Sequence, residues 1–472
     1  MKSDQSSYQI KTGNLLKFII GSLVGLFLFL FPWPTETAFN IPLGFAIDFI
    51  GGFLGGHRVS FFNLFSIQAP WDFNAATLLA YIFITISFLG TILAYAVKPG
   101  FIMNNEKLKS TFYAHPVYAV CRLLAFVFAT MVLFDFGPEA ITASWIGGLM
   151  LNELITGLVS IFLILAFAIP VLTDFGLMEF IGVLIRKVIR FLFTLPGRAS
   201  IDLAASWFGS SAVSVIITRN QHEKGFYTGR EAAAIAVNFS FVSLPFSFVV
   251  ARTMGIEPHF FLWYLIICIT CIVLAIITPR IWPLRNLKND YLEGVGKQID
   301  EEETVGVSRM KKALYTASER AGAAKASDVV KGGMKCYLDV FMDLLPVIMA
   351  LGTVALIVED ATPVFDWISI PMRWFLELLR VPGAADYAST TLVGFIDMFL
   401  PAIMLADSYY TETKFILGAL SIVQIIYMAE TGILILKSKM PLGFGRLFVL
   451  FLMRTLIGLP IIVLLTRLMM NF

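Results

Sequence analysis

Nine apolar runs, each at least 20 residues long, constrain the fold of this 472-residue chain more than any other feature. A helix needs about 20 apolar residues to cross the hydrocarbon core of a bilayer. The composition agrees, since 58% of the residues are hydrophobic and only 14% are charged, which excludes an ordinary soluble enzyme. We therefore predict an all-α polytopic membrane protein. The runs cover 15–34, 71–97, 115–137, 149–172, 230–254, 258–282, 337–358, 413–436 and 443–469.

Four further stretches between these runs do not fit a simple crossing. The stretches 177–195 and 364–381 are amphipathic at helical spacing, which is typical of helices that lie in the membrane interface. The apolar runs 199–218 and 387–407 are short and interrupted, which favours re-entrant hairpins that enter and leave on one side. Whether residues 41–65 are embedded in the membrane stays open.

The distribution of Lys and Arg predicts the orientation, because cytoplasmic segments carry an excess of these residues. With hairpins and a cytoplasmic N-terminus, 27 of the 35 basic residues lie inside, six lie outside, and Arg122 and Arg454 lie within spans. A full crossing by either short run would instead place the basic loop 285–330 outside. We expect a multi-pass protein of the bacterial cytoplasmic (inner) membrane with its N-terminus in the cytoplasm.

An internal repeat organises the chain. An offset of 186 residues aligns 165–199 with 351–385 without a gap and matches Pro196-Gly197 with Pro382-Gly383. Each half has a span, an interfacial helix, Pro-Gly, a short interrupted run and a broken span, and the predicted topology makes the two halves inverted. The predicted segments are the N-terminal scaffold spans 1–148, the first repeat with its following span 149–284, the cytoplasmic charged loop 285–334, the second repeat 335–440 and the C-terminal span 441–472.

The broken elements of the two repeats predict a binding site near the membrane midplane. Hairpin tips and helix breaks leave backbone N–H and C=O groups that protein, water or ligand must satisfy. The first tip is expected near 209–211, and Pro245 interrupts the span that follows it. The predicted solute-binding residues are Gly209, Ser210, Ser211, Asn238, Ser240, Ser243, Gly394, Gln424 and Thr431.

Two carboxylates stand in otherwise apolar runs. An ionised side chain inside a membrane costs at least about 2.5 kcal/mol, so such residues are functional candidates. Asp397 and Glu430 are therefore predicted to bind a coupling ion or a cationic group of the solute. Asp202 fits a helix cap, whereas Glu153 and Asp343 lie near span ends and fit structural roles.

Several kinds of chemistry have no support in the sequence. Neither the Walker motif, nor the dinucleotide fingerprint, nor the nucleophile elbow occurs. The four histidines and four cysteines have no metal-ligand spacing, so neither a metal nor a cofactor is expected. A net charge of +2 gives no reason to expect nucleic acid. The four histidines are His57, His115, His222 and His259. The four cysteines, which we interpret as small core residues, are Cys121, Cys268, Cys271 and Cys336.

The run Asp202-Leu-Ala-Ala-Ser-Trp-Phe-Gly-Ser-Ser-Ala, with Thr228-Gly-Arg-Glu and Asn238-Phe-Ser after it, resembles the nucleoside-recognition or Gate domain. The whole chain is similar to YjiH-type bacterial membrane proteins. The Gate domain also occurs in concentrative nucleoside transporters, so the resemblance implies inverted repeats with hairpins and broken helices, and ion-coupled uptake. Their Asn-Phe-Ser element belongs to the later repeat, whereas Asn238-Phe239-Ser240 falls in the earlier one. Ferrous-iron permeases and spore-maturation proteins also carry the domain, so it leaves the solute open.

We therefore predict a secondary active transporter of a small polar organic solute that works by alternating access with Na⁺ or H⁺ as coupling ion. The solute classes left open are nucleosides, amino acids or peptide-like compounds, and cationic amines. The alternatives are an uncoupled channel or facilitator, an exporter, and a non-transporting assembly or signalling protein. No enzymatic activity is expected. The expected partners are the solute and the lipid bilayer, and homo-oligomer formation stays open.

Cysteine labelling tests the predicted topology. In a background without native cysteines, Lys297→Cys should react with a membrane-impermeant maleimide only after the membrane is opened, because its loop is predicted to be cytoplasmic. Arg58→Cys, predicted to be external, is the control and should react in intact cells. Labelling of Lys297→Cys from outside would overturn the topology.

Overall fold

The computed structural model describes residues 10–31, 33–34, 39–40, 42–43, 45–46, 49–50, 53, 58–59, 73–113, 116–208, 211–292 and 308–470. Helices dominate these residues, and the described strands are four two-residue pieces in two antiparallel pairs. The predicted polytopic α-helical membrane protein is confirmed at this level. Most of the ambiguous region 41–65 lies outside the described residues, as do Gly209 and Ser210, His57 and His115, and the side chains of Glu153 and Cys336.

Seven described helical stretches are long and apolar enough to cross a membrane. They correspond to seven of the nine predicted runs. The other two runs, 230–254 and 413–436, are helical but each is broken near its middle. The seven stretches are Thr12–Phe29, Ala75–Val97, Pro116–Leu133, Ser144–Val171, Glu257–Arg280, Val340–Val358 and Phe444–Met470.

The chain forms two compact units. The larger unit comprises Met1–Asn40, Ile169–Ala326 and Ile368–Phe472, and the smaller unit comprises Ile41–Ala168 and Ser327–Trp367. All predicted solute- and ion-binding residues belong to the larger unit.

The elements of the larger unit follow the predicted order. Its first stretch holds α1 (Thr12–Leu30), β1 (Trp33–Pro34) and β2 (Phe39–Asn40). Its second stretch holds α9 (Leu177–Val188), η5 (Ile189–Phe193), α10 (Ala199–Phe208), α11 (Ser211–Glu223), α12 (Gly229–Asn238), α13 (Leu244–Thr253), η6 (Glu257–His259), α14 (Phe260–Ile277), η7 (Thr278–Arg280), η8 (Leu284–Asn286) and α15 (Arg309–Ala323). Its third stretch holds most of α18 (Val364–Leu378), then α19 (Ala384–Tyr387), α20 (Thr390–Val393), α21 (Leu400–Ala406), α22 (Thr411–Val423), η10 (Met428–Gly432), α23 (Ile433–Leu436) and α24 (Phe444–Met470).

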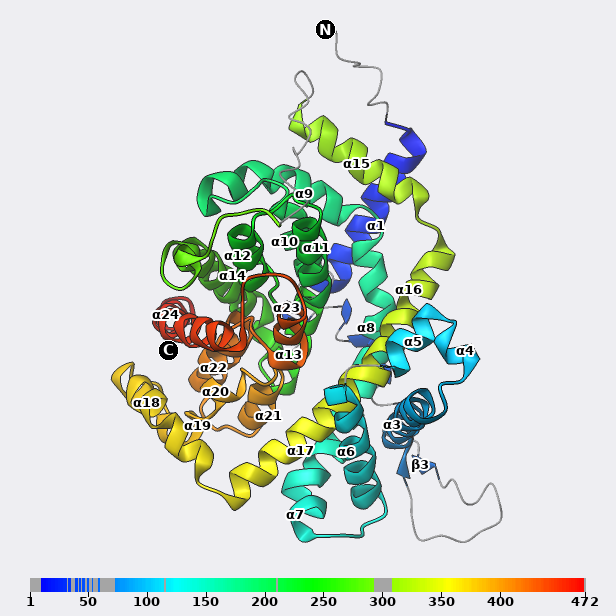
Figure 1. Cartoon of the computed structure of the whole chain (residues 1–472), viewed down its shortest axis with the longest axis vertical. Helices are drawn as coiled ribbons and strands as arrows, with labels where there is room; N and C mark the ends of the chain where they lie inside the picture. The colour runs from blue at the N-terminus through cyan, green and yellow to red at the C-terminus, as the bar shows by residue number, and fades with distance from the viewer. Residues whose placement is uncertain are drawn as a thin grey trace. The chain divides into compact units, whose positions relative to one another are not determined.

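Helices at matching places in the two predicted repeats make similar contacts. Helix α11 packs on α12 and also on η10 and α23, which form the second part of the other broken helix. Likewise α21 packs on α22 and also on α13. Helices α14 and α24, which follow the two broken helices, pack on each other as well as on α12 and α22 respectively. Figure 1 shows these helices gathered into one bundle.

Part of the predicted charged loop folds as a helix. Helix α15 packs on α1 and α9 (Figure 1) through a face of small side chains, of which Ala313, Ala317 and Ala321 are fully buried. Gly176, which has a left-handed φ of 90°, lies against the Ala317 backbone at a distance that leaves no room for a Cβ. Small residues allow this close approach of helices.

The smaller unit contains four of the apolar spans. Helix α6 packs on α3, η4 and α17, and these elements form its described core. Its elements are β3 (Arg58–Val59), β4 (Phe73–Asn74), α3 (Ala75–Ile92), η3 (Leu93–Val97), α4 (Gly100–Met103), α5 (Glu106–Phe112), α6 (Pro116–Leu133), α7 (Glu139–Thr142), η4 (Ser144–Ile155), most of α8 (Thr156–Thr173), α16 (Ala326–Asp339), η9 (Val340–Leu344) and α17 (Leu345–Ala361).

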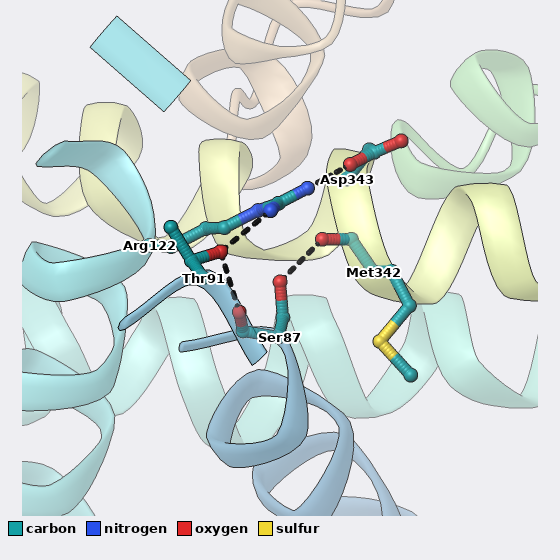
Figure 2. A network of polar contacts seen from close by, with 5 residues as sticks. All are labelled: Ser87, Thr91, Arg122, Met342 and Asp343. Carbon is teal, nitrogen blue, oxygen red and sulfur yellow. Dashed lines mark hydrogen bonds and ion pairs between the residues drawn. The ribbon is translucent and has the colours of Figure 1, made fainter. Parts of the chain in front are cut away.

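A buried arginine joins three elements of the smaller unit. Figure 2 shows the Arg122 guanidinium on α6 reaching Thr91 of α3 and Asp343 of η9. Nη1 donates to Thr91 Oγ1 at 2.7 Å, and Nη2 forms an ion pair with Asp343 Oδ1. Ser87 Oγ donates to the Met342 carbonyl at 2.6 Å, which fixes the π-helical turn η9 against α3. Arg122 is fully buried, and the Asp343 carboxylate of η9 balances its charge.

Removing one partner of this pair should destabilise the protein more than removing both. Asp343→Leu leaves the Arg122 charge buried without a counter-charge, and we expect the free energy of unfolding to fall by about 1–3 kcal/mol. The double variant Arg122→Met/Asp343→Leu should recover most of this loss, because two apolar side chains replace two charges. Unfolding in mixed detergent micelles measures both.

The exposed pair Arg373–Glu377, whose side chains are about half exposed, is the matched control. Glu377→Leu should change the free energy of unfolding by less than about 1 kcal/mol. Equal losses in Asp343→Leu and in the double variant would contradict the proposed balance of charge.

Candidate functional site

The first tip residue within the described part is Ser211, which begins α11. Its Oγ donates to Glu430 Oε1 at 2.7 Å, so the start of this helix meets the π-helical turn η10 of the other half. The positive end of the α11 dipole favours a carboxylate at this place. Further along α11, Ser214 accepts a hydrogen bond from Ser240 at 3.2 Å. The first contact joins two predicted site residues, whereas Ser214, the partner of Ser240 in the second, was not among them.

The first broken span consists of α12 and α13, which are separated by residues 239–243. A capping box between Thr228 and Glu231 starts α12. Pro245 lies in the first turn of α13, where its missing N–H disturbs no helical bond. Asn238, the last residue of α12, is buried, and its Nδ2 donates to the Ala234 carbonyl at 2.9 Å.

A buried arginine joins both breaks. Arg454 of α24 donates from Nη1 to Asn238 Oδ1 at 2.7 Å, and from Nε and Nη2 to the Val423 carbonyl at 3.1 and 2.8 Å. Asn238 and Val423 are the last residues of α12 and α22, where each helix dipole has its negative end. Thr278 Oγ1 also donates to Asn238 Oδ1, at 2.7 Å. The cation therefore balances two helix ends instead of a carboxylate.

The second break, at residues 424–427, satisfies its own backbone. Tyr427 OH donates to the Ile422 carbonyl at 2.6 Å, and Thr431 Oγ1 donates to the Ile425 carbonyl at 2.8 Å. The Ile425 N–H donates to Tyr427 OH, and the Tyr427 N–H donates to Thr431 Oγ1. Ile425 has a left-handed φ of 63°, which turns the chain here. Thr431, a predicted solute-binding residue, thus has its hydroxyl engaged with the backbone of the break.

The second interrupted run lies against this break. Helix α20 ends at Val393, and the non-helical segment 394–399 leads into α21. The Met428 N–H donates to the Phe395 carbonyl at 2.8 Å, which ties the segment to η10. Asp397 is 3% exposed, its Oδ1 accepts the Phe399 N–H at 2.7 Å, and its carboxyl interacts electrostatically with Glu430.

The Gln424 side chain bridges the second half of the site. Its Nε2 donates to the Thr391 carbonyl at 2.7 Å and to Thr455 Oγ1 at 2.8 Å. Its Oε1 faces Gly394, where a Cβ would collide with it. Gln424 is fully buried, and none of the described residues donates a hydrogen bond to Oε1.

The larger unit thus brings most of the described candidates together. Ser211, Gly394, Asp397, Gln424, Glu430 and Thr431 lie around the second break, and Asn238 and Ser240 lie at the first. Ser243 is buried at the start of α13, where its carbonyl accepts bonds from Ser247. Among the described residues, no group of three or more His, Cys, Asp or Glu side chains is placed to hold a metal ion.

Asp202 has a different role from the helix cap that the sequence suggested. Its carboxylate accepts Thr218 Oγ1 at 2.6 Å and Tyr227 OH at 2.7 Å, and the residue is fully buried. It therefore joins α10 to α11 and to the turn that precedes α12.

Arg454 joins the two helix breaks of the candidate site, and the sequence interpretation did not include it among the site residues. The signal was present, because an ionisable residue inside an apolar run marks a functional or structural centre. In the predicted topology Arg454 lies within the last span.

Arg454→Lys should destabilise the larger unit. A lysine cannot bond Val423 O and Asn238 Oδ1 with the same fork of donors, so a buried acceptor loses its partner, and the free energy of unfolding should fall by about 1–3 kcal/mol. Arg446→Lys is the control, because exposed Arg446 bonds only the Pro441 carbonyl at the start of the same helix. Equal unfolding curves for the two variants would contradict the role given to Arg454.

Comparison with known proteins agrees with this architecture. The nucleoside-recognition family, Gate, matches residues 155–257, which run from η4 through α10 and α11 to the end of the first broken helix. An uncharacterised protein of Alkalihalophilus pseudofirmus is 43% identical over 453 residues, which cover 96% of this chain and 94% of that protein. No solved structure matches the chain.

The relative aligns along nearly the whole chain, and the Gate match falls on the elements that carry Ser211, Asn238 and Ser240. The Gate family is associated with membrane transport rather than with catalysis. The chain belongs to the YjiH-type family of membrane proteins that carry the nucleoside-recognition (Gate) domain.

Proposed function

We propose that the protein is a secondary active transporter of a small polar organic solute, which works by alternating access in the bacterial cytoplasmic membrane. The observation that carries this proposal is the meeting of two broken helices and two interrupted runs around buried Asp397 and partly buried Glu430. Broken helices that meet within the membrane are the sites of secondary transporters. Asp397 and Glu430 would bind the coupling ion or a cationic group of the solute, and Ser211, Ser240 and Gln424 would contact the solute.

The Arg122–Asp343 pair supports a first hairpin that does not cross the membrane. Arg122 lies near the start of α6, and Asp343 lies near the start of the span 340–358, so their contact places both starts on one side. An odd number of crossings must then separate these spans. The runs 149–172, 230–254 and 258–282 supply three, whereas a crossing by 199–218 would make four.

A second contact supports the same conclusion for the second hairpin. Trp263 Nε1 donates to the Phe415 carbonyl at 3.0 Å, so the starts of α14 and α22 lie on one side of the membrane. The span 340–358 is the one crossing needed between them. A crossing by the 387–407 run would put the two starts on opposite sides.

The exchanged contacts support inverted repeats. Helix α11 touches the second part of the other half's broken helix, and α21 does the same in return. A two-fold relation between the halves predicts such reciprocal pairs. In the proposed cycle the bundle that carries the hairpins moves against the outer spans, and the site opens to each side in turn.

Transport into proteoliposomes tests the function. We would measure concentrative uptake and charge movement for a panel of nucleosides, amino acids, dipeptides and polyamines, with and without Na⁺ and a pH gradient. At least one compound should accumulate, and Asp397→Asn and Glu430→Gln should each lower its ion-driven uptake by about tenfold or more, because each removes a charge that we propose binds the coupling ion. Glu377→Gln, at an exposed position, should transport normally.

Three results would count against the proposal. Equilibration of a solute without accumulation would indicate an uncoupled channel or facilitator. Full ion-dependent uptake by Asp397→Asn and Glu430→Gln would remove the ion role of these acids. The absence of any panel compound that is transported or that stabilises the purified protein would favour an assembly or signalling role.

A further inference from the structure

We infer that Gln424 Oε1, covered by Gly394, is the hydrogen-bond acceptor for a protonated amine of the solute, with Asp397 and Glu430 as its counter-charges. This inference rests on the proposed function and specifies the chemical class of the solute. The groups that surround Gln424 Oε1 decide what kind of ligand can donate a hydrogen bond to it.

Gln424 Oε1 stands out because the break around it is otherwise satisfied. The carbonyls of residues 422, 423, 424 and 425 each accept a hydrogen bond, and the N–H groups of residues 424 to 428 each donate one. A buried polar atom without a partner costs about 1–3 kcal/mol and calls for an explanation.

The orientation of the amide is fixed by its other end. Nε2 donates both of its hydrogens, to the Thr391 carbonyl and to Thr455 Oγ1. A flipped amide would place an oxygen against the Thr391 carbonyl, where both atoms are acceptors. Oε1 therefore faces Gly394, and only a donor can complete it.

The charges near this atom select the kind of donor. Asp397 lies three residues after Gly394. Glu430 is held near Asp397, because the Met428 N–H donates to the Phe395 carbonyl. Arg454 directs its guanidinium to Val423 O and Asn238 Oδ1, and it gives no hydrogen bond to Gln424. Two carboxyl groups and one amide oxygen together favour a cation that carries several N–H donors.

A ligand can reach Gln424 Oε1 only if Gly394 moves away from it. Its Cα lies so close to Oε1 that a methyl group at this position would collide with the amide. The non-helical segment 394–399 therefore covers the acceptor in this state, and its displacement would uncover Oε1 and Asp397 together. The amine would then take the place that Gly394 occupies.

Matched ligands test the inference in the full-length purified protein. One series keeps the carbon skeleton and changes the end groups: 1,4-diaminobutane, 1,4-butanediol and succinate. A second series compares lysine with norleucine, and a third compares adenosine with inosine. Thermal stabilisation titrations are run in NaCl and in choline chloride, so that binding of Na⁺ is separated from binding of the amine.

We expect a diamine or lysine to bind at least about tenfold more tightly than its uncharged counterpart, because buried acceptors reject a ligand that lacks the donor. Gln424→Leu should reduce this preference at least about fivefold. Thr455→Val, which removes only a partner of Nε2, is the matched control and should keep it. Circular dichroism and size-exclusion profiles show that both variants fold.

Several results would overturn the inference. These are preference for succinate or butanediol, preference for adenosine without binding of any amine, and an unchanged amine preference in Gln424→Leu. Stabilisation by Na⁺ alone that is lost in Gln424→Leu would assign the atom to the coupling ion instead. If no compound binds, both this inference and the transport function fail.

The two proposals fail separately in the remaining cases. Amine binding that depends on Gln424, without uptake into proteoliposomes, would keep the acceptor and remove the transport function. Concentrative uptake of an uncharged solute that is unaffected by Gln424→Leu would keep the transport function and remove the acceptor.

Discussion

The bond set of Arg454 is the interaction on which the larger unit depends. Helices α12 and α22 end at buried residues, and each leaves carbonyl groups and a negative dipole end that neighbouring groups must satisfy. One guanidinium from α24 meets both ends, through Val423 O and Asn238 Oδ1. Because the same cation serves both breaks, a movement of one broken helix changes the surroundings of the other. The alternating access that we propose would require such coupling.

The two units use a buried arginine in different ways. In the smaller unit Arg122 has a carboxylate partner, and the pair joins three elements into a rigid assembly. In the larger unit Arg454 bonds two neutral oxygens, the Val423 carbonyl and Asn238 Oδ1, whereas Asp397 accepts the Phe399 N–H and Glu430 accepts the Ser211 hydroxyl. Asp397 and Glu430 are the acids that we propose to bind a cation from outside the protein.

The sequence predicted those features that depend on neighbours along the chain. Apolar runs, the interruptions at Asn238 and Pro245, and the acids Asp397 and Glu430 within apolar runs are all local patterns, and the helix breaks fall where they indicated. The contacts of Arg454 with Asn238 and of Arg122 with Asp343 could not be predicted, because each joins residues more than 200 positions apart in the chain. Asp202 looked like a helix cap because it lies near the start of the short run 199–218. Its actual partners, Thr218 and Tyr227, come later in the chain and could not be identified from the local pattern. The unpaired oxygen of Gln424 depends on three-dimensional placement alone.

The π-helical turns η9 and η10 have a consequence for how the chain tolerates length changes. Each such turn holds about one residue more than an α-helical turn, and it presents an acid, Asp343 or Glu430, to a partner from another helix. Deleting one residue there would restore a regular helix and rotate everything on one side of it by about 100°. Asp343 or Glu430 would then point away from its partner, although only one residue had been removed from the chain. In η9 and η10, therefore, register matters more than residue type, and single-residue gaps in relatives would carry more information there than substitutions.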